Sequence, residues 1–141
     1  MELKQKLKIF YITSIFSMLF AVLGFSYNTW RMELSEANNN IRTASFEVLL
    51  QLSEFEQILY ASHYDQDARE GSPRKAWVKV DLINDLSGLI DQQVKAESVK
   101  LKELWGTHWE SVSTDEEAIK LLVIQIDQVR NKIKTVLENL N

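Results

Sequence analysis

The sequence predicts an all-α protein in which a single N-terminal transmembrane helix continues into an up-down-up antiparallel three-helix bundle of the coiled-coil type. Three observations predict this fold. The 22 residues from Ile9 to Trp30 carry no charge. The chain of 141 residues has only four glycines and one proline, which leaves few helix breakers. After Arg31, apolar residues recur at the three- and four-residue spacing of amphipathic helices.

Composition narrows the class of function. The net charge of −4 argues against a nucleic-acid partner, because such proteins usually present a basic face. The chain has no cysteine, which excludes a disulfide framework and a thiolate zinc site. The sequence contains no nucleophile elbow, no phosphate-binding loop and no HExxH pattern. It therefore predicts a protein that is not an enzyme and that uses no cofactor.

The predicted transmembrane helix covers residues 9–30, and at about 1.5 Å per residue it is long enough to cross a bilayer. Three basic residues lie in the N-terminal segment 1–8, namely Lys4, Lys6 and Lys8. Because positive charge favours the cytoplasmic side, we expect a cytoplasmic N-terminus and residues 31–141 outside the cytoplasm. The alternative is a cleaved signal peptide with Gly24 and Ser26 at the cleavage site, although the apolar run is longer than most signal cores.

Small residues recur on one face of this predicted helix. They are Ser14, Ser17, Ala21 and Gly24. Within lipid, such a face lets a second helix approach closely and offers hydroxyl groups for hydrogen bonds. The other interpretation is chance, because serine and glycine are common in membrane helices.

Three further helices are predicted, over residues 31–69, 73–105 and 115–140. Each carries apolar or small residues in a heptad pattern. In the first they are Ile41, Ser45, Val48, Leu52, Phe55, Leu59 and Ser62; in the second Ala76, Val80, Ile83, Ser87, Ile90, Val94, Leu101 and Leu104; in the third Ile119, Leu122, Ile126, Val129, Ile133, Val136 and Leu140. Three residues mark the first connection. Gly71 is expected to cap the end of one helix, Ser72 to cap the start of the next, and Pro73 to take its first helical position.

Helix lengths predict which segments lie together. A second helix of about 48 Å would return the chain to near the level of Asn38–Asn40, and the third would leave the C-terminus at the far end. The second connection, with Trp105, His108 and Trp109, would then lie near the membrane and far from His63. His63 and Asp67 have the spacing of two metal ligands on a helix, but two ligands do not make a site.

Two groups of residues are candidates for interaction outside the membrane. Arg74 and Lys75 follow Pro73 at a helix N-terminus, where the helix dipole disfavours cations, and Trp77 lies beside them. This conflict indicates either an acidic partner or neutralisation by nearby carboxylates. Trp105 and Trp109 would contact lipid headgroups or a partner, or else would close the end of the core.

These features favour an interaction protein: a membrane-anchored helical bundle that acts as an accessory or scaffold subunit of an envelope complex. The expected partners are the lipid bilayer and either a second copy of the chain or another envelope protein, and the expected location is the bacterial inner membrane with a periplasmic bundle. The alternative is an extracytoplasmic sensory bundle that binds a ligand and signals through a partner. A polar pocket near Ser45, Ser62 or Ser87 would favour sensing. A third possibility is a structural spacer.

Overall fold

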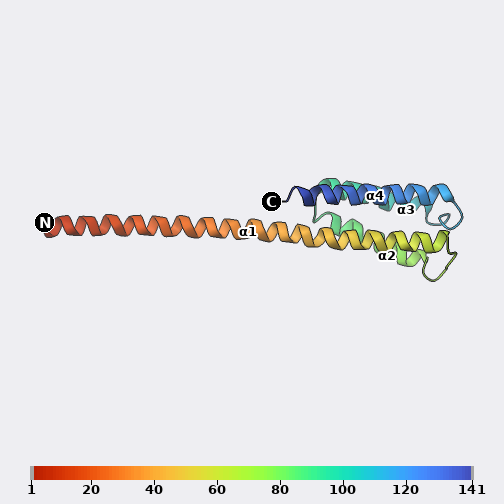
Figure 1. Ribbon diagram of the computed structural model, residues 1–141, viewed down its shortest axis with the longest axis horizontal. Helices are drawn as coiled ribbons and strands as arrows, with labels where there is room; N and C mark the ends of the chain where they lie inside the picture. Colours follow the sequence, from red (N-terminus) through yellow and green to blue (C-terminus); the bar gives the residue numbers. More distant parts are fainter. Residues whose placement is uncertain (1, 141) are drawn as a thin grey trace. The chain divides into compact units, whose positions relative to one another are not determined.

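The computed structural model describes residues 2–140 and is all-helical over that range, with no strand among the described residues. Its four helices are α1 (Leu3–His63), α2 (Pro73–Ser87), α3 (Gln92–His108) and α4 (Glu116–Glu138) (Figure 1). The chain divides into two compact units at Ala37 and Asn38. Met1 and Asn141, the outer limits of the predicted segments, lie outside the described residues.

The first unit is the N-terminal part of α1. It contains the one stretch of the described residues that is long and apolar enough to cross a membrane, and none of that stretch is buried within the protein. Phe10 is 65% exposed and Phe25 is 74% exposed. A helix that is apolar on all sides is typically covered by a protein core or by a bilayer. The chain itself does not supply the cover.

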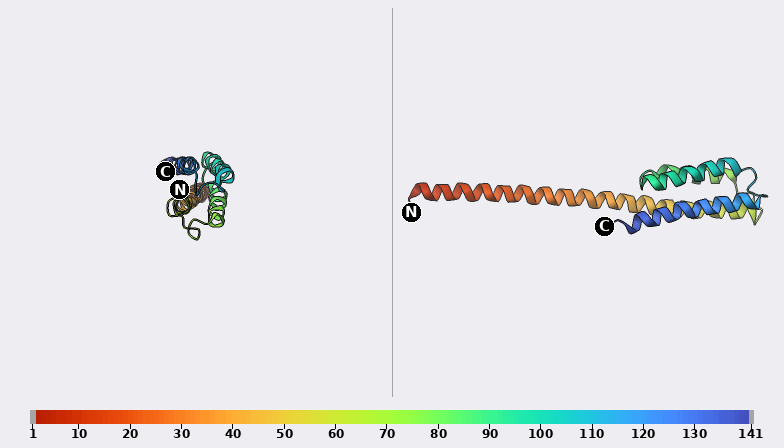
Figure 2. Two further views of the ribbon diagram at one scale, coloured as in Figure 1. Left: turned by 90° about the vertical axis from the view of Figure 1, so that its right-hand side faces the viewer. Right: turned by 90° about the horizontal axis from the view of Figure 1, so that it is seen from above.

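The second unit contains the rest of α1 together with α2, α3 and α4, which run side by side (Figure 2). The heptad pattern predicted for this part of α1 is confirmed, since Val48, Leu52, Phe55 and Leu59 are fully buried. The pattern predicted for the last helix is confirmed as well from Ile119 to Ile133. One hydrophobic cluster joins buried residues of all four helices.

The single helix predicted over 73–105 is wrong, because the chain turns at residues 88–91. Helix α2 ends at Ser87, and Asp91 caps α3 by accepting a hydrogen bond from the Gln93 N–H at 2.7 Å. The two helices are antiparallel. Their contacts are Lys95 Nζ with the Asn84 carbonyl oxygen at 2.6 Å, Lys102 with Asp81 at 2.8 Å, and the rings of Trp77 and Trp105 at 6.0 Å. The second unit therefore has four helical segments where three were predicted.

This extra turn reverses the direction of everything after it. The His63 Nδ1 atom lies 2.8 Å from the carbonyl oxygen of Val112, so the connections 64–72 and 109–115 share one end of the second unit, called here the His63 end. The opposite end has a hollow lined by Ile41, Ile90, Val136 and Leu140, among others. The C-terminal part of α4 thus lies near Ile41, and the prediction that it lies at the far end is wrong.

The first connection is tighter than the sequence predicted. Helix α1 ends at His63, not near Arg69, and Gln66 takes a left-handed backbone conformation with φ of 49°. Gly71 is not a helix cap. A Cβ atom at Gly71 would lie 2.5 Å from the Cα atom of Ser62, so only glycine allows this loop to pack on α1. The predicted start of the next helix is confirmed, with Ser72 as N-cap and Pro73 in the first turn.

Candidate interaction surfaces

The small residues Ser14, Ser17, Ala21 and Gly24 are all exposed on the first unit. A Cβ atom added at Gly24 would meet nothing within 4 Å. This face of the helix is therefore uncovered, and its use as a contact for a second helix stays a prediction.

Arg74 and Lys75 are exposed at the start of α2. The Lys75 ammonium lies 3.4 Å from the Glu70 carboxylate across the connection, which is the neutralisation that the sequence offered as an alternative. Asp67 is engaged differently. Its carboxylate accepts hydrogen bonds from the N–H groups of Glu70 and Arg69, and these hold its pKa below the usual range. Within residues 2–140, Arg74 makes no ion pair.

Trp105 and Trp109 lie toward the His63 end of the second unit, and the prediction that they lie near Asn38–Asn40 is wrong. Trp105 is only 1% exposed, and its ring meets that of Phe55 edge-on at 5.5 Å. Trp77 is half-buried against Trp105, and Trp109 is packed against the core. Trp105 therefore closes the core of the bundle, which is one of the two roles predicted for it. Because it is buried, it offers no surface to a partner.

The two histidines lie at the same end, not at opposite ends as predicted. The Val112 N–H donates to the His108 carbonyl oxygen at 3.0 Å, and the Val112 carbonyl oxygen faces His63. The described residues nevertheless contain no group of three or more potential metal ligands. His63 is positioned by a backbone carbonyl and by an edge-on contact with the Tyr64 ring.

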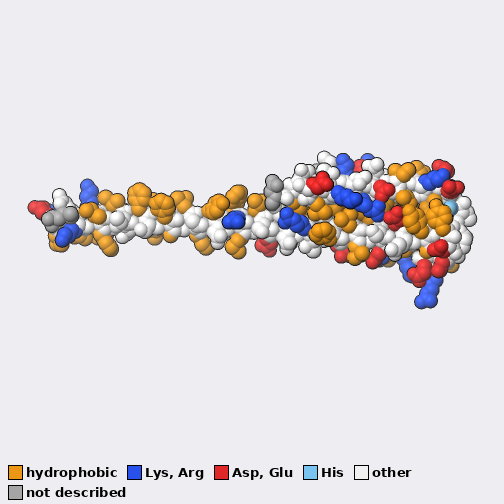
Figure 3. All heavy atoms as spheres, viewed as in Figure 1, with side chains coloured by type: hydrophobic (Ala, Val, Ile, Leu, Met, Phe, Trp, Pro, Cys, Tyr) orange, Lys and Arg blue, Asp and Glu red, His pale blue; other side chains and the backbone are white. Residues whose placement is uncertain are grey.

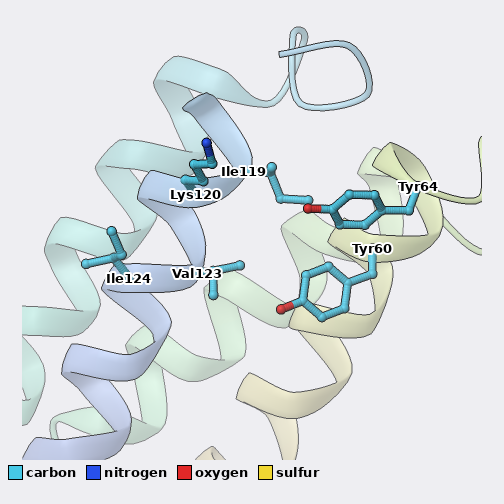
Figure 4. Close-up of a pocket in the computed structure, with 6 residues that line it drawn as sticks. All are labelled: Tyr60, Tyr64, Ile119, Lys120, Val123 and Ile124. Atoms are coloured by element: carbon cyan, nitrogen blue, oxygen red, sulfur yellow. The ribbon is translucent and has the colours of Figure 1, made fainter. Parts of the chain in front are cut away.

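Sequence reasoning missed an apolar groove between the end of α1 and the start of α4. It has a volume of about 250 Å³ and is lined by Tyr60, Tyr64, Ile119, Lys120, Val123 and Ile124. The ring of Tyr60 in α1 and the ring of Tyr64 just after it both point toward α4 (Figure 4). Tyr64 is 63% exposed and Ile124 is 57% exposed, so a large part of the lining is accessible. The groove forms only where two segments about sixty residues apart in the sequence pack together. The spacing of residues within one helix does not predict such a contact.

Charged side chains surround this groove, called here the α1–α4 groove. Arg130 of α4 pairs with Glu56 at 2.9 Å and also with Asp127. Lys120 pairs with Glu116 at 3.2 Å and Glu117 at 3.4 Å. Figure 3 shows hydrophobic side chains gathered toward the His63 end, with both acidic and basic side chains around them.

Tyr60 belongs to the same network. Its hydroxyl donates a hydrogen bond to Glu56 at 2.9 Å. Burial of the phenol and the neighbouring Glu56 carboxylate together raise the pKa of Tyr60 to about 12. The hydroxyl therefore stays neutral at physiological pH and acts as a hydrogen-bond donor. The negative charge of Glu56 is balanced by its ion pair with Arg130.

A second hollow at the His63 end is more polar. It has a volume of about 240 Å³, and its lining includes Ser62, Gln66, Asp67 and Ser113. The Gln66 side chain already donates to the carbonyl oxygens of His63 and Ser113. Elsewhere, Ser87 donates to the Ile83 carbonyl oxygen within its own helix and is fully buried. Of the serines named as markers of a polar pocket, Ser62 is the one that lines this hollow.

No protein-family model, curated protein or solved structure matches the chain. The class defined by the structure is an all-helical protein with one candidate membrane-spanning helix.

Proposed function

We propose that this chain is a single-pass protein of the bacterial inner membrane whose helical bundle binds another envelope protein. Residues 9–30 cross the bilayer, the lysine-rich N-terminus is cytoplasmic, and the second unit lies in the periplasm. The proposal gives the chain an accessory or scaffold role and no catalytic one. The observation that carries it is the apolar first unit, none of whose candidate span is buried within the protein.

The second unit supports the interaction part of the proposal. Phe46, Leu50, Tyr64 and Ile124 are each more than half exposed, although the core residues of the same unit are buried. Uncovered apolar groups that gather on one part of a surface are typical of protein interaction sites. A pure spacer would need only its length and its buried heptads.

Two measurements test the proposal. Carbonate extraction of membranes should leave the protein in the pellet, and release into the supernatant would contradict the anchor. Photo-crosslinkers placed at Ser17, Tyr64 and Arg74 in intact cells should then give adducts with one envelope protein, identified by mass spectrometry. Adducts only to a second copy would make the chain a homo-oligomer, and no adduct at any position would contradict an interaction role.

The polar hollow at Ser62 favours sensing as a second candidate function. Its serine, amide and carboxylate groups suit a small polar ligand such as an amino acid. Purified full-length protein should then gain thermal stability from one member of a panel of amino acids and dicarboxylates. The variant Asp67→Asn should lose that gain. An unchanged melting temperature across the panel would argue against sensing by this hollow.

A further inference from the structure

The α1–α4 groove is shaped for a row of side chains from a second helix. Its volume of about 250 Å³ is below the range of roughly 300–1,000 Å³ that encloses small-molecule ligands. One side is formed by the end of α1 with Tyr60, followed by Tyr64, and the other by α4 with Val123 and Ile124 (Figure 4). A helix laid between two others places its side chains into such a furrow, which is the usual packing of ridges into grooves.

Toward the Ile41 end, the outward face of α1 carries further exposed apolar side chains. Phe46, Leu50, Tyr60 and Tyr64 are 62%, 53%, 38% and 63% exposed. With Ser53 and Gln57 in the intermediate places, the spacing from Phe46 to Tyr60 alternates between four and three residues, which is the seam of a coiled coil. Tyr64 follows directly after the end of the helix at His63. This seam is separate from the buried heptads of the same helix, so it is free to pair with a helix from outside.

The charges around the groove favour a partner with positively charged side chains. Four carboxylates, those of Glu56, Glu116, Glu117 and Asp127, share only two cations, Arg130 and Lys120. Glu116, Glu117 and Asp127 are 68%, 80% and 54% exposed at the side chain. Each cluster therefore keeps an excess of negative charge at the rim, within reach of a cationic side chain on a docked helix.

From these contacts we infer that the α1–α4 groove binds an amphipathic helix of another protein, whose apolar stripe is flanked by lysine or arginine. The apolar stripe would cover Tyr64 and Ile124, and the flanking cations would face the two carboxylate clusters. A second copy of the chain is a poorer occupant, because residues 38–141 carry a net charge of −5 and two copies would repel. This inference rests on the proposed interaction function and names the class of its partner.

The test uses the full chain in nanodiscs of zwitterionic lipid and a synthetic helical peptide of about 18 residues, roughly 27 Å long. The peptide carries leucines at coiled-coil spacing and lysines at the flanks, and its control carries glutamates in place of the lysines. Binding is followed by the methyl NMR signals of isoleucine, after subtraction of binding to empty nanodiscs. Ile119 and Ile124 should shift with the lysine peptide, while the buried Ile83 and Ile133 stay unchanged.

Matched variants locate the site. Ile124→Lys and Tyr64→Ser should each weaken binding of the lysine peptide by about tenfold, which corresponds to about 1.4 kcal/mol. Leu89→Lys is the control, because Leu89 is equally exposed at 65% and lies outside the groove. It should change the affinity by less than about twofold.

Several outcomes would overturn the inference. Equal binding of the glutamate peptide would remove the charge argument, and shifts confined to other isoleucines would place the peptide elsewhere. Absence of binding by both peptides would dismiss the groove, and self-association of the chain that blocks the peptide would make a second copy the occupant. Each of these results leaves the crosslinking test of the proposed function intact, so the two failures are distinguishable.

Discussion

The two parts of helix α1 arrange their apolar side chains differently. In the first unit they cover all sides and are exposed, as Phe10 and Phe25 illustrate. In the second unit they form a buried stripe through Val48, Leu52 and Phe55, with a narrower exposed seam opposite. The difference teaches that one regular helix can carry two patterns of apolar residues. The first part has them on every side and buries none of them in the protein, whereas the second part buries one stripe in a protein core.

The largest expected effect separates two phenylalanines of the same helix. Phe55 is fully buried against Trp105, whereas Phe46 is 62% exposed. Phe55→Ala should lower the free energy of unfolding by about 3–5 kcal/mol, because it leaves a cavity in the core. Phe46→Ala should change it by less than about 0.5 kcal/mol. Denaturant unfolding followed by tryptophan fluorescence measures both changes. Equal losses of unfolding free energy would show that the buried stripe and the exposed seam do not differ.

Two glycines, one in each unit, test whether a Cβ atom can be added without a clash. Gly71→Ala should destabilise the bundle by about 1–3 kcal/mol, because the new Cβ atom would lie 2.5 Å from Ser62. Gly24→Ala should be harmless, because nothing lies within 4 Å of the corresponding position. Thermal unfolding of the two variants beside the parent chain measures the difference. A stable Gly71→Ala variant would show that the loop is not pressed against α1.

The turn at residues 88–91 depends on its helix cap. Asp91→Ala removes the hydrogen bond to the Gln93 N–H and should cost about 1 kcal/mol of stability. Asp85→Ala is a matched control, since Asp85 is exposed on α2 and caps no helix. Hydrogen exchange should rise at the start of α3 in the first variant only. If α2 and α3 were one continuous helix, Asp91 would be an ordinary helical residue and its replacement would be neutral.

The smallest effect concerns a carboxylate between α3 and α4. The Gln125 side chain donates to Glu97 at 2.9 Å and lowers the pKa of that carboxyl from its ordinary value of 4.5. A lowered pKa in the folded state stabilises the fold above pH 4.5 and ceases to do so as the pH falls through the folded-state value. Gln125→Leu should therefore cost about 1 kcal/mol at pH 7 and progressively less as the pH falls below 4.5. A cost independent of pH would contradict this pairing.

The sequence predicted the buried stripes well because helix periodicity is a local property. Ile119, Leu122, Ile126 and Val129 occupy the predicted inner face of α4 and are fully buried or nearly so. The start of α2 was predictable for the same reason, since Pro73 acts on its own backbone. The apolar first unit was equally visible, because it is a run of uncharged residues.

The turn between α2 and α3 was missed because its apolar residues keep the helical spacing. Ile83, Ser87, Ile90 and Val94 are three to four residues apart and all buried, although the helix ends between them. A single Gly88 costs a helix only about 1 kcal/mol and does not by itself predict a break. The combination of Gly88 with Asp91 as an N-cap was the available signal.

The missed turn between α2 and α3 also put the predicted positions of the candidate sites at the wrong end of the second unit. With three helices, Trp105 and His108 were expected far from His63, and with four they lie at its end. The α1–α4 groove could not be predicted for the same reason, because Tyr64 and Ile124 meet only through the correct topology. The small-residue face of the first unit follows from helical spacing alone, and its role in helix contact stays a prediction.

The most direct test of the membrane anchor uses the absence of cysteine from the chain. Single cysteines at Lys4, Leu23 and Arg74 are probed in intact bacterial cells with a maleimide that enters the periplasm but does not cross the inner membrane. We predict labelling of Arg74→Cys in intact cells, labelling of Lys4→Cys only after the inner membrane is opened, and none of Leu23→Cys until detergent is added. Equal labelling of all three in intact cells, or labelling of Lys4→Cys alone, would contradict a helix that crosses the membrane with its bundle outside.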